Sequence, residues 1–315
     1  MHEAILSCSN DSNGRDRSSK TGARQLKYDP NQVAILRWYP ANTTTSFFLV
    51  GNPVAVVFDG ASIWASSVNA NNVTKLSAND GTLSGPFAVG TAPRDMAFDG
   101  AHIWVANNGS NNVTELNASD GSVVNAFNVG TAPYGVAFDG ANIWVTNEGS
   151  NNVTELLAST GAVLGTFNVG SSRTGLAYDG ANIWVANAHS NTVTKLRASD
   201  GHVLGTFAVG TEPIGVAFDG INIWVANAKS NNVTKLSPAG TKLGTFAVGT
   251  NPQAVAFDGV NIWVANAGSG NVTKLQASNG AHLGTFSVGP GTAPVGLAFD
   301  GANIWVANEG TVSKL

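Results

Sequence analysis

The stretch Val216-Ala217-Phe218-Asp219-Gly220-Ile221-Asn222-Ile223-Trp224-Val225-Ala226-Asn227 recurs as near-copies seven times along this chain of 315 residues. The tryptophan of each copy marks the period, with successive spacings of 40, 40, 40, 40, 39 and 42 residues between Trp64, Trp104, Trp144, Trp184, Trp224, Trp263 and Trp305. A fixed period of this length is typical of propellers and solenoids, because one unit is too small to bury its own apolar face. The repeat therefore predicts one ring of stacked units across most of the chain.

Turn signals divide each unit into four short segments that are rich in β-branched and aromatic residues. In the copy around Trp224, these segments cover 216–218, 223–226, 233–236 and 243–248. An Asp-Gly pair separates the first two segments in every copy and suits a tight hairpin turn. We interpret these aspartates as turn formers and the repeated tryptophans as packing residues between blades. The pattern predicts an all-β fold, a seven-bladed β-propeller of four-stranded antiparallel blades.

The two ends of the sequence predict how the ring closes. The last unit stops at Leu315 after a third strand, and its fourth strand is missing. Near the other end, Ser46-Phe47-Phe48-Leu49-Val50-Gly51 resembles the fourth strand and glycine at 244–249. We therefore expect an N-terminal strand to complete the C-terminal blade and remove an open sheet edge. The propeller is predicted at 43–315, after a mostly disordered leader at 1–42 with a possible extra strand near 32–39.

Composition excludes several classes of protein. Charged residues make up only 11% of the chain and the formal net charge is -4, so no basic field attracts phosphate. The single cysteine, Cys8, excludes an internal disulfide framework and a cysteine-based metal site. No apolar run is long enough to cross a bilayer, and the first residues lack the pattern of a secretory signal. We expect a monomer without a membrane span.

The repeat resembles the YVTN-type β-propeller repeat of bacteria and archaea. Val-Gly-x-x-Pro, Val-Ala-Phe-Asp-Gly, Ile-Trp-Val-Ala-Asn and Asn-Asn-Val-Thr-Lys-Leu recur in register over 46–315, and Trp-Val-Ala-Asn at 224–227 stands in place of the family's Tyr-Val-Thr-Asn. The chain is also similar, more distantly, to streptogramin B lyase (virginiamycin B lyase), a seven-bladed propeller with an Ile/Leu-Trp strand in each repeat. The first resemblance implies a binding or scaffold module at the cell envelope or exterior. The second implies Mg²⁺-assisted opening of a cyclic depsipeptide by elimination.

Candidate site residues lie where the copies disagree. In a four-stranded blade, the fourth-to-first and second-to-third connections share one face of the disc, and variable loops on one face are a natural place for a site. Most positions on this face where a polar residue replaces the usual repeat residue fall in blades two to five. The matching positions of the other blades mostly carry small or apolar residues, with Glu309 as an exception. We predict a binding face that contains Arg94, Asp95, Tyr134, Arg173, Gln253, Asn108 and Lys229. The plain alternative is that these are tolerated surface substitutions on a scaffold.

Three functions are compatible with these residues. The leading hypothesis is a non-catalytic module without a cofactor that binds a protein, peptide or glycan on the loop face of blades two to five. The alternative is a lyase that uses Mg²⁺ and an acid-base pair of His189 with Glu148 or Glu212, although no metal-ligand spacing is present. Binding of single-stranded nucleic acid is disfavoured, because Asp95, Glu148 and Glu212 interrupt any basic track.

Overall fold

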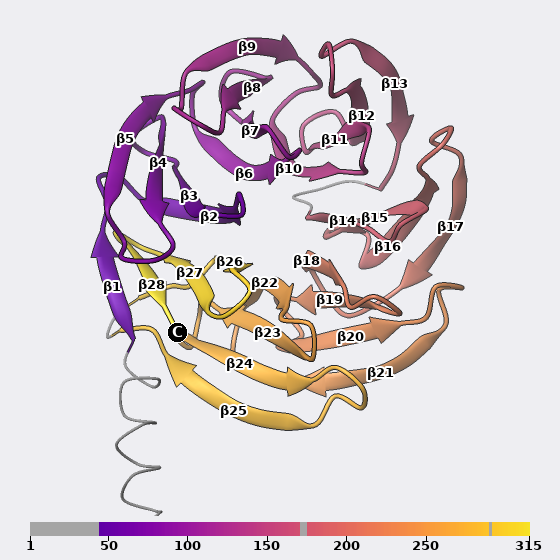
Figure 1. Cartoon of the computed structure of the whole chain (residues 1–315). Coiled ribbons are helices and arrows are strands. Elements are labelled where there is room, and N and C mark those ends of the chain that lie inside the picture. Colours follow the sequence, from indigo (N-terminus) through magenta and orange to yellow (C-terminus); the bar gives the residue numbers. More distant parts are fainter. Residues whose placement is uncertain (1–43, 171–174, 290–291) are drawn as a thin grey trace, which may run out of the picture. The chain divides into compact units, whose positions relative to one another are not determined.

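The computed structural model describes residues 44–170, 175–289 and 292–315. Within these ranges the chain forms seven four-stranded antiparallel sheets. The sheets surround a central axis as the blades of a propeller, with the first strand of each blade innermost and the fourth strand outermost (Figure 1). This confirms the predicted all-β, seven-bladed fold. The expected leader at 1–42, with the possible strand near 32–39, lies outside the described residues.

The first four blades follow the chain in order, and each takes its four strands from consecutive residues. Blade 1 contains β2 (Pro53–Phe58), β3 (Ser62–Ser67), β4 (Asn72–Ser77) and β5 (Leu83–Ala88). Blade 2 contains β6 (Pro93–Phe98), β7 (His102–Asn107), β8 (Asn112–Asn117) and β9 (Val123–Asn128). Blade 3 contains β10 (Pro133–Phe138), β11 (Asn142–Asn147), β12 (Asn152–Leu157) and β13 (Val163–Asn168). Blade 4 contains β14 (Leu176–Tyr178), β15 (Asn182–Asn187), β16 (Thr192–Arg197) and β17 (Val203–Ala208).

The last three blades complete the ring, and the seventh draws one strand from the other end of the chain. Blade 5 contains β18 (Pro213–Phe218), β19 (Ile223–Asn227), β20 (Asn232–Leu236) and β21 (Lys242–Ala247). Blade 6 contains β22 (Pro252–Phe257), β23 (Asn261–Asn266), β24 (Asn271–Gln276) and β25 (His282–Ser287). Blade 7 contains β26 (Gly296–Phe299), β27 (Ile304–Asn308), β28 (Thr311–Lys314) and β1 (Thr45–Phe48).

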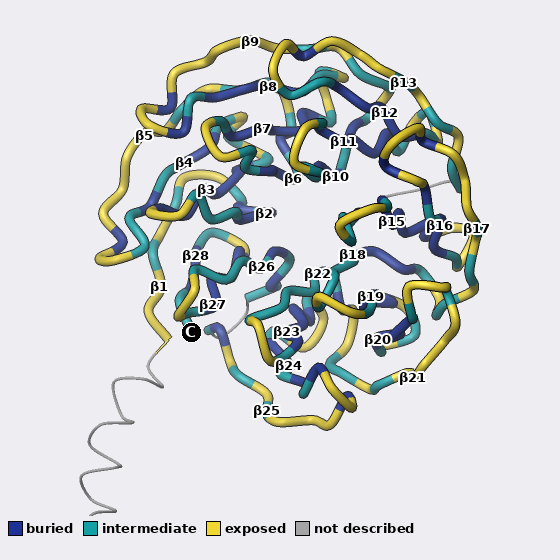
Figure 2. The backbone as a smooth tube through the Cα atoms, turned by 45° about the vertical axis from the view of Figure 1, so that its right-hand side comes forward, coloured by how far each residue is buried: buried dark blue, intermediate teal, exposed yellow. Residues whose placement is uncertain are grey.

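Blade 5 shows how closely the sequence pattern matches the strands. The strands begin and end within about three residues of the predicted segments, and the largest difference is at the start of the first strand. That strand begins at Pro213 because Pro213 pairs with Asn227 across a register shift before Val216. The second strand is buried along its whole length, whereas the fourth alternates between exposed and half-buried residues. Burial therefore decreases from the second strands to the rim of the ring (Figure 2).

One hydrogen bond recurs in every blade and joins the turn aspartate to the tryptophan. In each case the indole Nε1 of the tryptophan donates to Oδ2 of the aspartate five residues earlier, at 2.7 to 2.8 Å. The other oxygen accepts two backbone N–H groups, which for Asp219 are those of Ile221 at 2.9 Å and Asn222 at 2.6 Å. These contacts confirm that the aspartates form the turns. They also satisfy a buried indole N–H that would otherwise oppose burial of the ring.

The tryptophan rings fill the interfaces between neighbouring blades. Trp224 packs in one cluster with Ile262, Val264 and Leu275 of blade 6, although it belongs to blade 5. On its own sheet, the ring lies 5.4 Å from that of Phe246 in the fourth strand. The same pairing of a tryptophan with a fourth-strand phenylalanine occurs in all seven blades. Each tryptophan therefore holds its own blade together and wedges against the next one, as the sequence predicts.

The N-terminal strand closes the ring. Strand β1 pairs antiparallel with β28, placing Phe47 opposite Val312. Phe47 supplies the missing fourth-strand phenylalanine, because its ring stacks on Trp305 with centroids 5.6 Å apart and planes inclined by 23°. The ring also covers Gly81 of blade 1 so closely that a Cβ at Gly81 would overlap it. One side chain thus ties the N-terminal strand to blades 7 and 1, which confirms the predicted closure.

Lysines in the third strands link five of the blades to their neighbours. Their ammonium groups lie 4.6 to 5.1 Å from the tryptophan ring centroids, a distance that favours cation-π attraction. Four of them also donate to a carbonyl oxygen in the next blade, as Lys235 does to Ala277 at 2.7 Å. The exception is Lys274, because blade 7 takes its third and fourth strands from opposite ends of the chain and has no connecting turn there.

Blades 2 and 3 carry glutamate where the other blades carry this lysine. Glu155 accepts a hydrogen bond from Asn142 Nδ2 at 2.9 Å, and burial together with nearby Asp139 raises the pKa of Glu155 to about 7. Glu115 lies 3.4 Å from His102 Nδ1. Burial raises the pKa of Glu115, while the histidine opposes that change. The interfaces that follow blades 2 and 3 therefore hold a buried acid in place of an ammonium bridge.

Loss of the closing aromatic stack will destabilise the ring. We expect Phe47→Ala to lower the free energy of unfolding by about 3 kcal/mol, because it removes the contacts with Trp305 and Gly81. Phe48→Ala is the matched control, since Phe48 is the next residue of the same strand and is 81% exposed. Denaturant unfolding monitored by tryptophan fluorescence will measure both. Equal effects from the two variants would contradict the closure described above.

Removal of the closing strand will expose a sheet edge. We expect deletion of residues 1 to 51 to give insoluble or oligomeric protein, because β28 would lose its partner and present unpaired backbone groups. Size-exclusion chromatography with light scattering will measure the oligomeric state. A soluble monomer that melts cooperatively would show that β1 is dispensable for closure.

Restoring the repeat lysine will strengthen the interface after blade 3. We expect Glu155→Lys to raise the free energy of unfolding at pH 8 by about 1 kcal/mol, through contact of the new ammonium with the Trp144 ring and removal of a buried carboxylate. Glu115→Lys will give a smaller gain, because it also removes the contact with His102. Thermal melts at pH 8 will compare the two. A loss of stability in Glu155→Lys would show that this position has adapted to the acid.

Candidate functional site

The first strands of the blades converge on a cavity at the axis of the ring. The cavity, here called the axial cavity, has a volume of about 550 Å³ and takes lining residues from β2, β6, β10, β14, β18, β22 and β26. This size is within the range of pockets for small ligands. Its apolar lining includes Val54, Val56, Met96, Leu176, Ile214, Val216, Val255, Val295 and Leu297. Its polar and charged lining consists of Asn52, Arg94, Asp95, Tyr134, Gln253 and Glu309.

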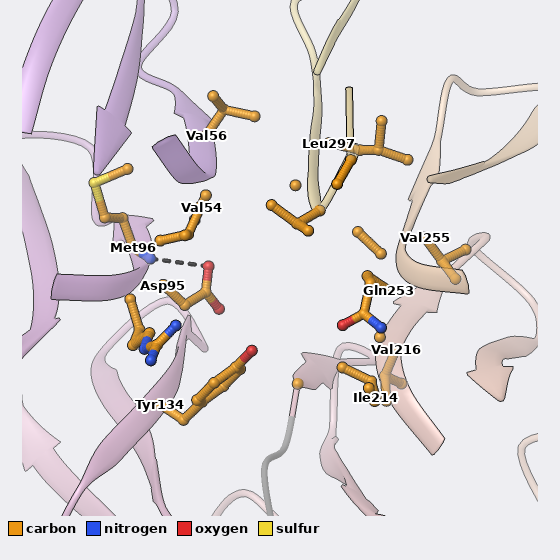
Figure 3. Close-up of a pocket in the computed structure, with 18 of the residues that line it drawn as sticks. Val54, Val56, Asp95, Met96, Tyr134, Ile214, Val216, Gln253, Val255 and Leu297 are labelled. Atoms are coloured by element: carbon orange, nitrogen blue, oxygen red, sulfur yellow. Dashed lines mark hydrogen bonds between the residues drawn. The ribbon is translucent and has the colours of Figure 1, made fainter. Parts of the chain in front are cut away.

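Asp95 occupies a position that the other blades reserve for glycine or alanine. The equivalent Gly175 donates its backbone N–H to Ile214 O of the next blade at 2.9 Å, and a Cβ there would approach that oxygen to 2.6 Å. Asp95 makes the inter-blade link with its side chain instead, because Oδ2 accepts from the N–H of Val136 in blade 3 at 3.2 Å. Its Oδ1 accepts from the N–H of Met96 at 2.9 Å (Figure 3).

The environment of Asp95 favours its neutral form. Burial among the first strands raises the pKa of Asp95 to about 6, against the opposing effect of the two backbone N–H donors. In Figure 3 the carboxyl group and the Tyr134 hydroxyl both point into the axial cavity. The cavity therefore contains a carboxyl group that changes its charge between about pH 5 and pH 7.

Arg94 brings a positive charge to the same wall of the cavity. Its guanidinium lies 5.7 Å from the ring centroid of Tyr134, in the range of a cation-π contact. The Nε atom is buried and has no hydrogen-bond partner. Among the residues that the structure describes, no carboxylate lies close enough to Arg94 to form an ion pair. The charge of Arg94 is therefore available to a ligand in the cavity.

Gln253 faces this wall from the other side of the cavity. Its Nε2 donates to Asn251 Oδ1 at 2.6 Å, which fixes the orientation of the amide. Figure 3 shows the side-chain oxygen of Gln253 directed toward Asp95 and Tyr134. Glu309 lies at the cavity in the turn between β27 and β28 and is exposed. The cavity thus combines a cation, two acids, a phenol and two amides with apolar side chains.

Three other candidates from the sequence lie in loops away from the cavity lining. Asn108 donates from Nδ2 to Pro133 O at 3.2 Å and so links the loop after β7 to the start of β10. Lys229 Nζ pairs with Glu212 Oε2 at 3.0 Å, between the loops that flank β18 and β19. These contacts hold neighbouring loops of one face together. They give Asn108, Lys229 and Glu212 a structural role in addition to their place in the predicted binding face.

The proposed acid-base residues are also outside the cavity lining. His189 is exposed in the turn between β15 and β16, and Glu148 is half-buried in the turn between β11 and β12. Arg173 lies outside the described residues. Among the described residues, no group of three or more His, Cys, Asp or Glu side chains is placed to hold a metal ion.

No helix in the described part of the chain is long and apolar enough to cross a membrane.

The axial cavity lies at the centre of the ring, whereas the sequence predicts an off-centre patch in blades two to five, which stays a prediction. The polar lining of the axial cavity comes from blades 1, 2, 3, 6 and 7, because all first strands meet at the axis. Sequence reasoning also missed the apolar lining residues Met96 and Ile214, which resemble ordinary strand residues. An alignment of the seven repeats would have identified them. In this alignment Ile214 matches Arg94 and Tyr134, and Met96 matches Val216, so both lie in the columns that line the cavity.

Comparison with known proteins identifies the fold but not a family. No family profile and no curated protein matches this sequence. A solved structure of streptogramin B lyase is similar, with a TM-score of 0.74 and 18% identity over 86% of this chain and 96% of that chain. A catalytically inactive histidine-to-alanine variant of virginiamycin B lyase from Staphylococcus aureus, with quinupristin, has a TM-score of 0.75 and 19% identity over 86% and 98%.

A third similar structure has a different enzymatic function. Hydrazine synthase from Kuenenia stuttgartiensis has a TM-score of 0.73 and 19% identity over 84% of this chain and 95% of the matched chain. Identities this low establish a shared propeller fold, and one fold serves many activities. The expected resemblance to streptogramin B lyase is thus confirmed at the level of the fold. The resemblance to the YVTN-type repeat stays a prediction.

The raised pKa of Asp95 predicts how stability depends on pH. In the folded protein Asp95 keeps a proton that the unfolded chain loses near pH 4, so its contribution to stability falls as pH rises from about 4 to about 6. We expect Asp95→Asn to gain stability relative to wild type over this interval, by about 1 to 3 kcal/mol. Denaturant unfolding at pH 4 and pH 8 will measure the change.

Asp80→Asn provides a control of opposite sign. A hydrogen bond from the backbone N–H of Thr82 holds the pKa of the exposed Asp80 below its usual value. Its ionised form is therefore favoured in the folded state, and the variant will lose stability relative to wild type as pH rises through the acid range to about 4, with little further change up to pH 8. Denaturant unfolding of this variant is therefore measured at about pH 3 as well. The same direction of change in both variants would contradict the assignment of Asp95 as a buried acid.

Proposed function

We propose that this protein is a non-catalytic binding module that holds part of a protein, peptide or glycan ligand in the axial cavity. The observation that carries this proposal is the combination of apolar walls with Arg94, Asp95, Tyr134 and Gln253 at one cavity. Placed polar groups fix the orientation of a ligand and give specificity, while apolar side chains in the same pocket contribute contact area. The resemblance of the repeat to YVTN-type propellers supports a place at the cell envelope.

The architecture suits binding, because the cavity residues project from rigid strands. Asp95, Tyr134 and Gln253 belong to β6, β10 and β22, whose neighbouring second strands are fully or almost fully buried. Sites on strands are held more precisely than sites on loops. Side chains at the cavity are therefore positioned before a ligand arrives, which lowers the entropy cost of binding.

Replacement of two cavity residues will test the binding role. We expect Tyr134→Ala combined with Gln253→Ala to weaken ligand binding at least about tenfold, because the two side chains contact the ligand from opposite walls. Peptide and glycan arrays will first identify a ligand for the wild type, and calorimetry will then measure its affinity. Lys229→Ala is the control, since Lys229 lies outside the cavity lining.

Two results would contradict the binding role. One is unchanged affinity in the double variant while the Lys229 control weakens binding, which would place the ligand on the loops. The other is binding by neither array, with wild-type protein that is folded and monomeric. The double variant is expected to keep its melting temperature within a few degrees of wild type, since both side chains are only half-buried.

A lyase activity is the second candidate, favoured by the likeness of the fold to virginiamycin B lyase over most of both chains. His189, Glu148 and Glu212 lie in loops of the face at which the axial cavity opens, but they are outside its lining. Asp95 is the titratable group in the cavity whose pKa, about 6, suits proton transfer near neutral pH. Asp95 is therefore a second candidate base for a lyase, beside the acid-base pair expected from the sequence.

Incubation with quinupristin, the molecule present with the lyase variant, will decide between the two candidates. The binding role predicts that quinupristin stays intact with abundant protein, with or without Mg²⁺, as judged by mass spectrometry. A ring-opened product that disappears in the Asp95→Asn variant would favour the lyase. A product that persists in that variant and disappears in His189→Ala would restore the acid-base pair expected from the sequence.

A further inference from the structure

The guanidinium of Arg94 lines the axial cavity and has no ion-pair partner among the described residues. Asp95, its neighbour in the chain, already accepts hydrogen bonds from the N–H groups of Met96 and Val136. Glu309, the other acid of the cavity lining, is exposed and forms no ion pair with Arg94 among the described residues. A half-buried guanidinium at the wall of a cavity binds anions more strongly than one fully in water, because the local dielectric constant is lower.

The guanidinium is held in place for such a role. Its backbone lies in β6, where the carbonyl oxygen of Arg94 accepts a hydrogen bond from Ser66 Oγ of blade 1 at 2.5 Å. The side chain rests on the ring of Tyr134, and its Nε is covered and without a hydrogen-bond partner. Anchoring at both ends leaves the terminal amino groups to meet a ligand. A planar guanidinium forms its strongest contacts with carboxylates and phosphates, through paired hydrogen bonds.

The rest of the cavity favours a carboxylate over a phosphate. A dianionic phosphate would face the carboxyl group of Asp95 and the nearby Glu309 with only one described cation to offset it. A carboxylate carries a single charge, which the one guanidinium neutralises. The wall opposite Asp95 carries the apolar side chains of Val216, Val255 and Leu297 (Figure 3). A ligand whose tail is polar along its length would leave polar groups unpaired against this wall.

We propose that the axial cavity binds the end of an apolar chain that carries a carboxylate, with Arg94 as the anchor of the carboxylate. This inference rests on the proposed binding function and specifies its ligand. A peptide that ends in a valine- or leucine-like residue with a free carboxyl group meets the description. A short branched aliphatic acid has the same chemistry. The oxygen of Gln253, directed across the cavity, accepts a hydrogen bond from the peptide N–H in the first case.

The test compares one peptide as its free acid and as its amide. Isothermal titration calorimetry of the full chain with acetyl-glycyl-glycyl-valine will give the affinity of the acid, and the C-terminal amide of the same peptide will give the contribution of the charge. We expect the amide to bind at least about tenfold more weakly, the effect of losing one charge-assisted contact. A third titration with 3-methylbutanoate distinguishes a free aliphatic acid from a peptide terminus as the source of the carboxylate.

Variants connect the effect to the proposed anchor. Arg94→Met keeps the length of the apolar stem and is expected to remove the difference between acid and amide, whereas Arg94→Lys will retain part of it. Arg197→Met is the matched control, because Arg197 is an exposed arginine that pairs with Asp200 and lies outside the cavity lining. It will bind the acid as the wild type does. Thermal melts of each variant will show that the propeller remains folded.

The outcomes separate this inference from the function on which it rests. Equal affinities for acid and amide, no binding of either peptide or the aliphatic acid, or unchanged selectivity in Arg94→Met would overturn the carboxylate site. The binding function would still stand if Tyr134→Ala with Gln253→Ala abolished binding of another peptide or a glycan. Failure of every ligand class at the cavity would overturn both.

Discussion

The hydrogen bond from each tryptophan indole to the turn aspartate is the contact on which the rest of this propeller depends. It allows a large aromatic ring to be fully or almost fully buried between blades without leaving its N–H unpaired. The same carboxylate closes the hairpin between the first and second strands. One aspartate therefore determines both the turn and the depth of the ring. Because the ring packs against the following blade, each copy also determines how its neighbour is placed.

A closed ring brings the first strands of all blades to one axis, and this creates the axial cavity. The indole hydrogen bonds and the aromatic pairs that recur around the ring lie in the second and fourth strands. The first strands also contact one another between blades, and Asp95 shows how a cavity residue can provide such a contact. It replaces a glycine or alanine of the other blades and still links two blades through Val136. Its raised pKa is a property that the fold does not need.

The fold could be predicted almost completely because the information is repeated. A strand that is hard to assign in one copy can be assigned from the other six. Phe47 identifies the displaced fourth strand, because it matches the fourth-strand phenylalanine of every other blade. The site could be predicted in part. Arg94, Asp95, Tyr134 and Gln253 depart from the repeat and meet at the cavity, whereas Asn108 and Lys229 depart from it and contact neighbouring loops. Both groups look alike in sequence, because departure from a repeat does not reveal where a side chain is directed.

The blade, the number of blades and the closure of the ring can all be read from the sequence, since each follows from a local pattern of turns and apolar residues that recurs at a fixed period. Which of the unusual residues share a surface depends on the three-dimensional arrangement of the blades. Arg94 and Gln253 are 159 positions apart in the chain, and they face one cavity because the closed ring brings the first strands of blades 2 and 6 to the same axis. Likewise, Arg94 and Asp95 are neighbours in the sequence but form no ion pair, because Asp95 accepts hydrogen bonds from the backbone N–H groups of Met96 and Val136. The residue types alone do not show this choice of partners.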